Sequence, residues 1–186
     1  MVRIIAGAAR GRKLDTLEGL ETRPTLDRVK EAVVGSLQFR IPYADVLDLF
    51  SGSGNLGLEA ASRGAARVVL NDRNPACAAI IRNNAETLKL PAKTEVLNLD
   101  YVAAIERLKA QGASFDLAFL DPPYREGISE DAVRRLFAAG LIKPNGTVVL
   151  EHAAELTPAS LPGVFRVVKT KRFGKCGYSL IEEDGE

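Results

Sequence analysis

The sequence predicts an α/β fold with a mostly parallel, seven-stranded sheet that ends in an antiparallel hairpin. Two observations predict this class. From Asp45 onward, short apolar runs with high strand propensity alternate with helical patterns, which is typical of a parallel sheet covered by helices on both faces. Near the end, the strand-like runs Val164–Arg172 and Tyr178–Glu182 leave no room for a helix between them, so they predict a terminal hairpin, with Gly174 and Gly177 available for its turn.

The chain begins with a separate extension in this interpretation. Val2–Ala6 and Arg12–Leu14 flank a glycine-containing turn and predict two short strands. Pro24 and Thr25 then signal the start of a helix, and apolar residues recur after them at helical spacing: Leu26, Val29, Val33 and Leu37. We therefore divide the chain into residues 1–40, a basic hairpin and helix, and residues 41–186, the main domain.

Strands and helices alternate in order along the main domain. The strands are expected at residues 46–50, 67–70, 94–99, 115–120 and 147–151. The helices between them are expected to begin near Asn55, Pro75, Val102 and Glu130, and Asn74 followed by Pro75 is the cap and first-position pair of the second of these helices. Ligands of an open parallel sheet bind at the carboxyl edge of its strands, so the residues that follow these strands are the candidates for a functional site.

A glycine-rich loop follows the first of these strands. Gly52, Gly54 and Gly57 have the G-x-G-x-x-G spacing that opens a helix and lets a ligand lie against backbone N–H groups. Asp72 follows the second strand, about 20 residues after Gly52, where an acid can accept both hydroxyls of a ribose. Nicotinamide dinucleotides and S-adenosylmethionine both contain such a ribose, so the loop does not choose between them.

The tetrapeptide Asp121-Pro122-Pro123-Tyr124 follows the fourth strand at the same edge. It suits methyl transfer to an exocyclic amino nitrogen of a nucleobase, whose lone pair is conjugated with the ring and is a poor nucleophile. The Asp121 carboxylate and the Pro122 carbonyl can each accept one N–H and so aim that lone pair. Tyr124 offers a face on which an extruded base can stack. A nicotinamide enzyme would give this tetrapeptide no task.

Other residues at strand ends give weaker signals. Asp48 either accepts from the amino end of the cofactor's methionine part or is a structural acid. Asp100 either meets the adenine, together with the backbone N–H of Tyr101, or caps the next helix. His152 is the only histidine, and we interpret it as incidental because no recognisable motif gives it a nucleophilic partner.

Charge is unevenly placed although the formal net charge is only +1. Acid-free basic groups lie at both ends of the chain: Arg3, Arg10, Arg12 and Lys13, and then Arg166, Lys169, Lys171, Arg172 and Lys175. They favour a polyanionic partner, with a solvated basic face as the alternative. Cys77 and Cys176 have no metal-ligand spacing, and no apolar run approaches the ~20 residues of a membrane helix. We expect a cytoplasmic protein, without a metal, that acts as a monomer.

Several segments together resemble one known family. They are RIIAG at 3–7, GRKL at 11–14, TRPTLDRVKEA at 22–32, LDLFSGSGNLGLEAASRGA at 47–65 and LDPPY at 120–124. In order and spacing they are similar to the RsmD-type 16S ribosomal RNA guanine-N2 methyltransferases of bacteria. The TRPT-DR segment is the most specific, since many amino methyltransferases share the glycine loop and D-P-P-Y. The chain departs from the family at Ser51–Asn55, usually Ala-Gly-Ser-Gly-Ala, and at Asp72, commonly Glu.

The resemblance implies a Rossmann-like class I methyltransferase fold, S-adenosylmethionine as methyl donor, and a guanine of 16S RNA in the small ribosomal subunit as acceptor. The expected cofactor residues are Asp48, Ser51, Gly52, Gly54, Asp72, Arg73, Asp100 and Tyr101. The expected catalytic residues are Asp121, Pro122 and Tyr124. The expected RNA-contacting residues are Arg10, Arg12, Lys13, Arg23, Arg28, Arg172 and Lys175.

Four other functions stay open from the residues alone. An adenine-N6 methyltransferase acting on DNA or RNA would use the same D-P-P-Y geometry. A protein glutamine methyltransferase generally has Asn at the position of Asp121. An NAD-dependent oxidoreductase would explain the glycine loop and Asp72, and a non-catalytic RNA-binding module would explain the basic ends of the chain.

Overall fold

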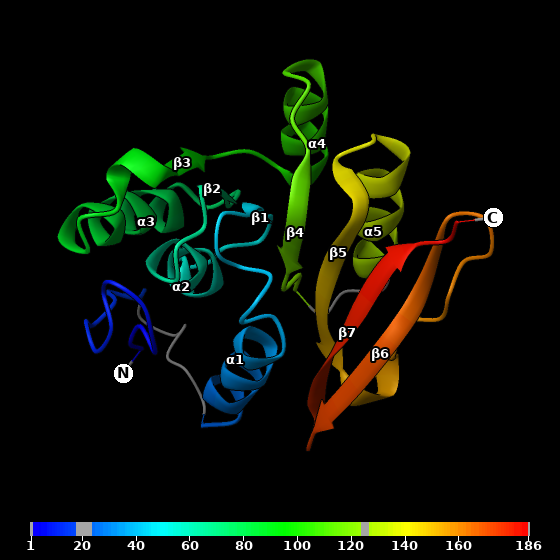
Figure 1. Cartoon of the computed structure of the whole chain (residues 1–186), viewed down its shortest axis with the longest axis horizontal. Coiled ribbons are helices and arrows are strands. Elements are labelled where there is room, and N and C mark those ends of the chain that lie inside the picture. The colour runs from blue at the N-terminus through cyan, green and yellow to red at the C-terminus, as the bar shows by residue number, and fades with distance from the viewer. Residues whose placement is uncertain (1, 18–23, 124–126, 186) are drawn as a thin grey trace.

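The computed structural model describes residues 2–17, 24–123 and 127–185 and, within the first helix, the side chains from Arg28 onward. In that part of the chain a seven-stranded sheet runs in the order β3-β2-β1-β4-β5-β7-β6 (Figure 1). Its strands are β1 (Asp45–Asp48), β2 (Arg67–Asn71), β3 (Thr94–Leu97), β4 (Phe115–Leu120), β5 (Ile142–Ala153), β6 (Phe165–Phe173) and β7 (Cys176–Glu183). β1 to β5 are parallel, and β7 pairs antiparallel with both β5 and β6.

Helices cover both faces of the sheet, as the alternation predicts. They are α1 (Pro24–Ser36), α2 (Asn55–Ser62), α3 (Pro75–Thr87), α4 (Tyr101–Ala110) and α5 (Ile128–Ala138), with short 3-10 helices η1 (Pro91–Lys93) and η2 (Ala154–Leu156). The apolar residues of α1, α2 and α3 share one buried cluster, and those of α4 and α5 share the other. None of the described helices is long and apolar enough to cross a lipid bilayer.

Helix starts match their sequence signals. Asn74 accepts a hydrogen bond from the N–H of Ala76 at 3.0 Å, and Pro75 stands at the first helical position of α3, where its missing N–H costs nothing. Gly54, with φ 84°, precedes α2 in the left-handed conformation that glycine adopts without strain.

The sheet corrects the sequence prediction in two places. β5 begins at Ile142, because the chain passes Asn145 with a positive φ of 64° and continues pairing with β4 through a register shift. The terminal hairpin turns at Gly174 and Lys175, whereas Gly177 lies within β7. A Cβ at Gly177 would stand 2.4 Å from the Lys171 carbonyl oxygen, so glycine is required there by close packing and not by the turn.

The N-terminal hairpin is present, but it forms an isolated bridge where two short strands were expected. Arg3 and Lys13 form a single antiparallel bridge, flanked by the hydrogen bond from Ile4 N to Arg12 O at 2.9 Å. Val2 and Ile4 are buried in the same apolar cluster as α1, α2 and α3. The hairpin therefore packs directly on the main domain, and its role as an RNA-contacting unit stays a prediction.

Candidate active site

The glycine loop connects β1 to α2 at the carboxyl edge of the sheet. Gly52 has φ 55°, and its N–H donates to Asp72 Oδ2 at 2.9 Å. Gly57 lies so close to the sheet that a Cβ would stand 2.7 Å from Leu70 Cδ2. Its N–H donates to Asp48 Oδ2 at 2.8 Å. The loop is thus fixed by two aspartates, one before it and one at the end of the neighbouring strand.

A cavity of about 540 Å³ opens over the ends of β1, β2 and β3. It collects five of the residues expected to hold the cofactor and the catalytic Asp121: Gly52, Asp72, Arg73, Asp100, Tyr101 and Asp121. Apolar side chains, including Leu49 and Leu99, form part of its lining. An apolar wall beside carboxylates at strand ends fits the adenosine part of S-adenosylmethionine.

Two of the three acids of this cavity, Asp72 and Asp100, serve the fold and also face the cavity. Asp72 accepts from the N–H of Gly52 and, through its other oxygen, from the N–H of Asn74 at 2.8 Å. Each carboxylate oxygen accepts more than one hydrogen bond, so Asp72 retains acceptor sites for ribose hydroxyls. Asp100 caps α4 by accepting from the N–H of Val102 at 3.0 Å. The cap and the cofactor role of Asp100 are therefore compatible.

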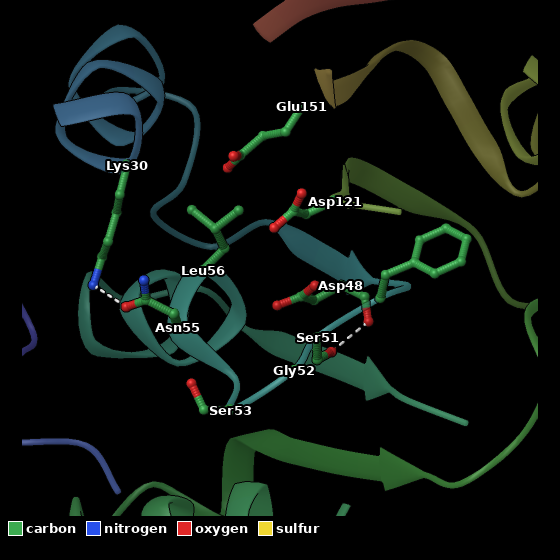
Figure 2. A pocket seen from close by; sticks show the side chains of 10 residues that line it. Lys30, Asp48, Ser51, Gly52, Ser53, Asn55, Leu56, Asp121 and Glu151 are labelled. Carbon is green, nitrogen blue, oxygen red and sulfur yellow. Dashed lines mark hydrogen bonds between the residues drawn. The ribbon is translucent and has the colours of Figure 1, made fainter. Parts of the chain in front are cut away.

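A second, smaller cavity of about 170 Å³ lies between the glycine loop and the ends of β4 and β5 (Figure 2). It is lined by Lys30, Asp48, Phe50, Ser51, Gly52, Ser53, Asn55, Leu56, Asp121 and Glu151. Phe50, Gly52 and Asp121 line both cavities. Asp121 therefore stands at the junction of a space that fits adenosine and a second space on its other side.

Three neighbouring strands each deliver a carboxylate to this small cavity. Asp48 ends β1, Asp121 follows β4 and Glu151 lies near the end of β5, and Figure 2 shows all three side chains pointing into one space. The register explains this, because Asp48 pairs with Phe119 and Leu120 pairs with Leu150. Alternation along each strand then places the three acids on the face that α1 and α2 cover.

The environment of these acids raises the pKa of all three. Burial raises the pKa of Asp48 to about 7, although the N–H of Gly57 partly opposes the shift. Asp121 reaches solvent through the cavities but is otherwise enclosed by protein, and this desolvation raises its pKa to about 6. Burial, and then the charges of Asp121 and Asp48, raise the pKa of Glu151. Such shifts are typical of functional sites.

Sequence reasoning missed two polar residues that shape the site. Asn71 is buried at the end of β2, and its amide group donates to the carbonyl oxygens of Leu49 and Leu99 at 3.1 and 3.0 Å, which fixes three strand ends together. Glu151 interrupts an apolar strand immediately before His152. An acid at the end of a predicted buried strand was the available signal for Glu151.

Of the other predicted residues, Ser51 lines the smaller cavity, whereas Pro122 and the described basic residues line neither cavity. Ser51 donates to the backbone oxygen of Asp48 at 2.7 Å, and Pro122 is buried behind Asp121. Tyr124 and Arg23 fall outside the described residues. Four of the residues expected to contact RNA have exposed side chains: Arg10, Lys13, Arg28 and Lys175. Their contact with RNA stays a prediction.

Two basic residues and the histidine have contacts within the chain. Arg12 donates to the Thr87 carbonyl at 2.7 Å, and Arg172 donates to Thr157 Oγ1 at 3.1 Å. His152 is buried with its Nε2 2.9 Å from Ser179 Oγ, and burial lowers its pKa. These contacts agree with a structural role for the histidine.

Comparison with known proteins gives consistent results over nearly the whole chain. A family model described as conserved hypothetical protein 95 matches residues 2–182. A Haemophilus influenzae protein named ribosomal RNA small subunit methyltransferase D is 36% identical over 182 residues, covering 97% of this chain and 93% of that protein. The Escherichia coli K12 protein of the same name is 33% identical over 185 residues, covering 100% of this chain and 91% of that protein.

Solved structures show the same architecture. The methyltransferase yhhF from Escherichia coli superimposes with a TM-score of 0.87 at 31% identity, covering 100% of this chain and 99% of that chain. The methylase HI0767 from Haemophilus influenzae has a TM-score of 0.80 at 35% identity, covering 100% and 99%. The Thermus thermophilus 16S rRNA N2 G1207 methyltransferase, solved with AdoMet and guanosine, has a TM-score of 0.69 at 24% identity, covering 91% and 45%, and shares the fold.

Proposed function

The chain belongs to the family described as conserved hypothetical protein 95, and on this premise we propose that it methylates the exocyclic N2 of a guanine in 16S ribosomal RNA. Relatives named ribosomal RNA methyltransferases match the chain over nearly its whole length, and they support the general activity. The chain is an S-adenosylmethionine-dependent ribosomal RNA methyltransferase. The choice of guanine N2 and of the small subunit as substrate is the proposal.

The observation that carries the proposal is the position of Asp121 between the two cavities. A methyltransferase must hold the nucleophile on one side of the transferred methyl group and the donor on the other. The larger cavity fits the adenosine part of the donor, and its residues Asp72 and Asp100 would meet the ribose and the adenine. Asp121 then faces the acceptor from the junction.

Asp121 and Pro122 would prepare the acceptor amine. S-adenosylmethionine supplies a methyl group on a positively charged sulfur. Asp121 and the Pro122 carbonyl each accept one N–H of the amino group, so the nitrogen lone pair is directed at the carbon that it attacks. The Asp121 carboxylate stabilises the positive charge that develops on nitrogen. With a pKa raised to about 6, it also accepts the departing proton more readily than an ordinary carboxylate.

The substrate side of the proposal depends on the exposed basic residues. Arg10, Lys13 and Arg28 are exposed on or near the N-terminal hairpin, and Lys175 lies at the turn between β6 and β7. Arginine and lysine at such positions attract an RNA backbone without reading its sequence. We infer that the enzyme acts as a monomer, in the cytoplasm, on assembled small subunits.

The test is transfer of labelled methyl from S-adenosylmethionine to small subunits from a strain that lacks this gene, followed by nucleoside analysis. The proposal expects labelled N2-methylguanosine. N6-methyladenosine would retain the mechanism and overturn the proposed acceptor. An absence of label, although the cofactor binds, would overturn the proposed substrate.

A further inference from the structure

Glu151 is a buried carboxylate that the mechanism above does not use. Glu151 is 6% exposed, and Figure 2 shows its side chain pointing into the small cavity beside Asp121. Within the described residues, its carboxylate has no hydrogen-bond donor and no ion-pair partner, unlike Asp48, which accepts from the N–H of Gly57. A buried carboxylate without a donor is costly, so its presence at this position points to a donor that enters the cavity.

The neighbouring groups do not supply that donor. Lys30 also lines the cavity, but its ammonium group is held by Asn55 Oδ1 at 2.6 Å and by the Glu59 carboxylate at 3.1 Å. Among the described residues, no group of three or more acids, cysteines or histidines is placed to share a metal ion. The missing partner is therefore best sought in the molecule that Asp121 meets.

The Watson–Crick edge of guanine offers two adjacent kinds of donor, the N2 amino group and the ring N1–H. Neighbouring strands lie about 4.8 Å apart, so side chains from adjacent strand ends can converge on neighbouring atoms of one base. The pairing of Leu120 with Leu150 places Asp121 and Glu151 side by side at these ends. If Asp121 holds the amino group, the next donor along the edge is N1–H.

We propose that Glu151 accepts the N1–H of the target guanine and thereby selects guanine over bases that have no donor at N1. The proposal rests on the proposed function and names the residue that reads the base. Adenine presents a lone pair at N1, which a carboxylate repels. A site built to receive a hydrogen bond rejects an analogue that lacks the donor by up to about 10⁴-fold.

The experiment removes the donor and the acceptor separately. After the methylated position is mapped, small subunits are assembled with either guanine or 2-aminopurine at that position. 2-Aminopurine keeps the N2 amino group but has a lone pair at N1. Methyl transfer to both substrates is measured for the wild type, Glu151→Gln and, as a matched control at an exposed acid of α4, Glu106→Gln. The dissociation constant of S-adenosylmethionine is measured for each variant by calorimetry.

We expect the wild type and Glu106→Gln to prefer guanine by about 100-fold or more, since a charged hydrogen bond is lost with 2-aminopurine. In Glu151→Gln, transfer to guanine should fall by about tenfold, because the amide oxygen still accepts the N1–H but without a charge. Transfer to 2-aminopurine should be unchanged or higher, because the glutamine amide can donate to N1. Cofactor affinity should stay within about threefold, a small effect beside that preference.

Three results would overturn the proposal: equal losses on both bases, no loss on guanine, or a loss of cofactor affinity that accounts for the loss of activity. If Glu151→Gln fails to fold, the wild-type preference decides, because a guanine to 2-aminopurine ratio near one is incompatible with an N1–H contact. Failure of the proposed function is separately visible, since the wild type would then produce no N2-methylguanosine at all.

Discussion

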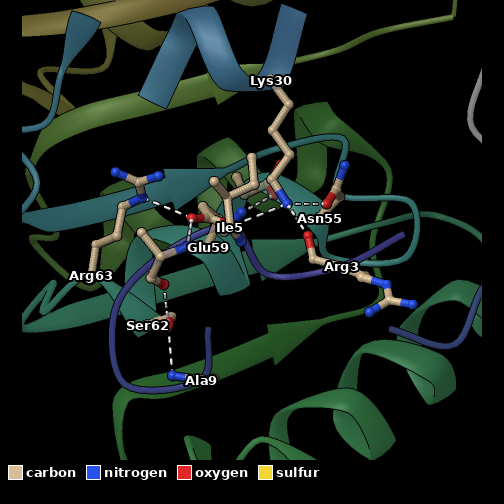
Figure 3. Close-up of polar contacts among 11 residues, drawn as sticks. Arg3, Ile5, Ala9, Lys30, Asn55, Glu59, Ser62 and Arg63 are labelled. Carbon is tan, nitrogen blue, oxygen red and sulfur yellow. Dashed lines mark hydrogen bonds and ion pairs between the residues drawn. The ribbon is translucent and has the colours of Figure 1, made fainter. Parts of the chain in front are cut away.

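Two clusters of buried charge lie close together in this protein and differ in one respect. Around Glu59, which is fully buried on α2, every carboxylate oxygen has donors (Figure 3). The N–H groups of Ile5 and Ala6 donate to it at 2.7 and 3.0 Å, Arg63 Nε donates at 2.7 Å, and Lys30 Nζ lies 3.1 Å away. In the small cavity, Asp48 has one N–H donor from the glycine loop and Glu151 has no donor among the described residues.

The difference separates charges that hold the fold from charges that await a ligand. Glu59 ties the N-terminal hairpin to α1 and α2, so its interactions are complete in the free protein. On the proposal above, Glu151 gains its donor when the target base enters the cavity. Functional sites are often stabilised less than they could be for this reason, and replacing their groups commonly increases stability while activity is lost.

The largest effect should follow from breaking the complete cluster. Glu59→Ala removes the carboxylate that pairs with the buried Lys30 ammonium group at 3.1 Å and that accepts from two backbone N–H groups. Loss of one partner of a buried ion pair costs about 3–5 kcal/mol. For a chain of this size the melting temperature should fall by about 10 °C. Thermal unfolding measures it, with the exposed Glu31→Ala as control, and a fall of less than ~2 °C would remove Glu59 from this role.

The next effect should appear in activity and not in stability. Asp121→Ala removes an acceptor of the target amino group, so kcat should fall about 10³-fold, as when a preorganised transition-state contact is lost. The affinity for S-adenosylmethionine should change little, because the carboxylate acts mainly on the acceptor. Single-turnover methyl transfer and calorimetry measure the two quantities. A loss of cofactor binding that matches the loss of activity would show that Asp121 serves the donor instead.

A smaller effect should depend on pH. Because burial raises the pKa of Asp48 from an ordinary value of 3.8 to about 7, the folded state retains a proton that the unfolded state has lost between these values. Stability from this group therefore decreases as pH rises toward about 7. Asp48→Asn does not titrate, and its oxygen can still accept from Gly57. Its melting temperature should exceed that of the wild type by about 4 °C near pH 8 and by less near pH 5.

The control for this prediction is the pH dependence itself. Melting temperatures of Asp48→Asn and the wild type are compared across the range in which only the wild-type carboxyl titrates. A difference that does not vary with pH would mean that Asp48 is already ionised in the folded protein and that burial does not govern it.

The smallest effect should concern RNA affinity. Neutral replacement of Arg10, Arg12 and Lys13 should reduce the slope of log affinity against log salt by about 2, since each lost phosphate contact contributes about 0.7–0.9. Binding to small subunits at several salt concentrations measures the slope, and Lys93→Gln, at an exposed position on η1, serves as control. An unchanged slope would mean that the N-terminal hairpin does not contact RNA.

Local sequence signals predicted the parts of the molecule that depend on local structure. The glycine spacing located the loop, the Asn74-Pro75 pair located the start of α3, and D-P-P-Y located the end of β4. The spacing between Gly52 and Asp72 also predicted that Asp72 lies beside the glycine loop, where it lines the larger cavity. Gly177 was assigned to a turn because a glycine near a hairpin suggests one, whereas the close approach of a neighbouring strand is not visible in the sequence.

The non-local contacts were not predictable in the same way. Lys30 and Glu59 meet from separate helices, and Glu151 reaches Asp121 only because β4 and β5 pair in a particular register. No local pattern records such a pairing. The contrast between the complete and the incomplete cluster emerges only from the folded chain.

One measurement tests the division between these clusters most directly: the melting temperatures of Glu151→Gln and Glu59→Gln, compared with the wild type at about pH 8. At that pH the unfolded chain carries ionised carboxylates, so a raised pKa in the folded state lowers stability. Because Glu151 has no donor within the described chain, its neutral replacement should melt at or above the wild type, while Glu59→Gln melts several degrees below it. A Glu151→Gln protein that melts several degrees below the wild type would contradict the account, since Glu151 would then hold the fold.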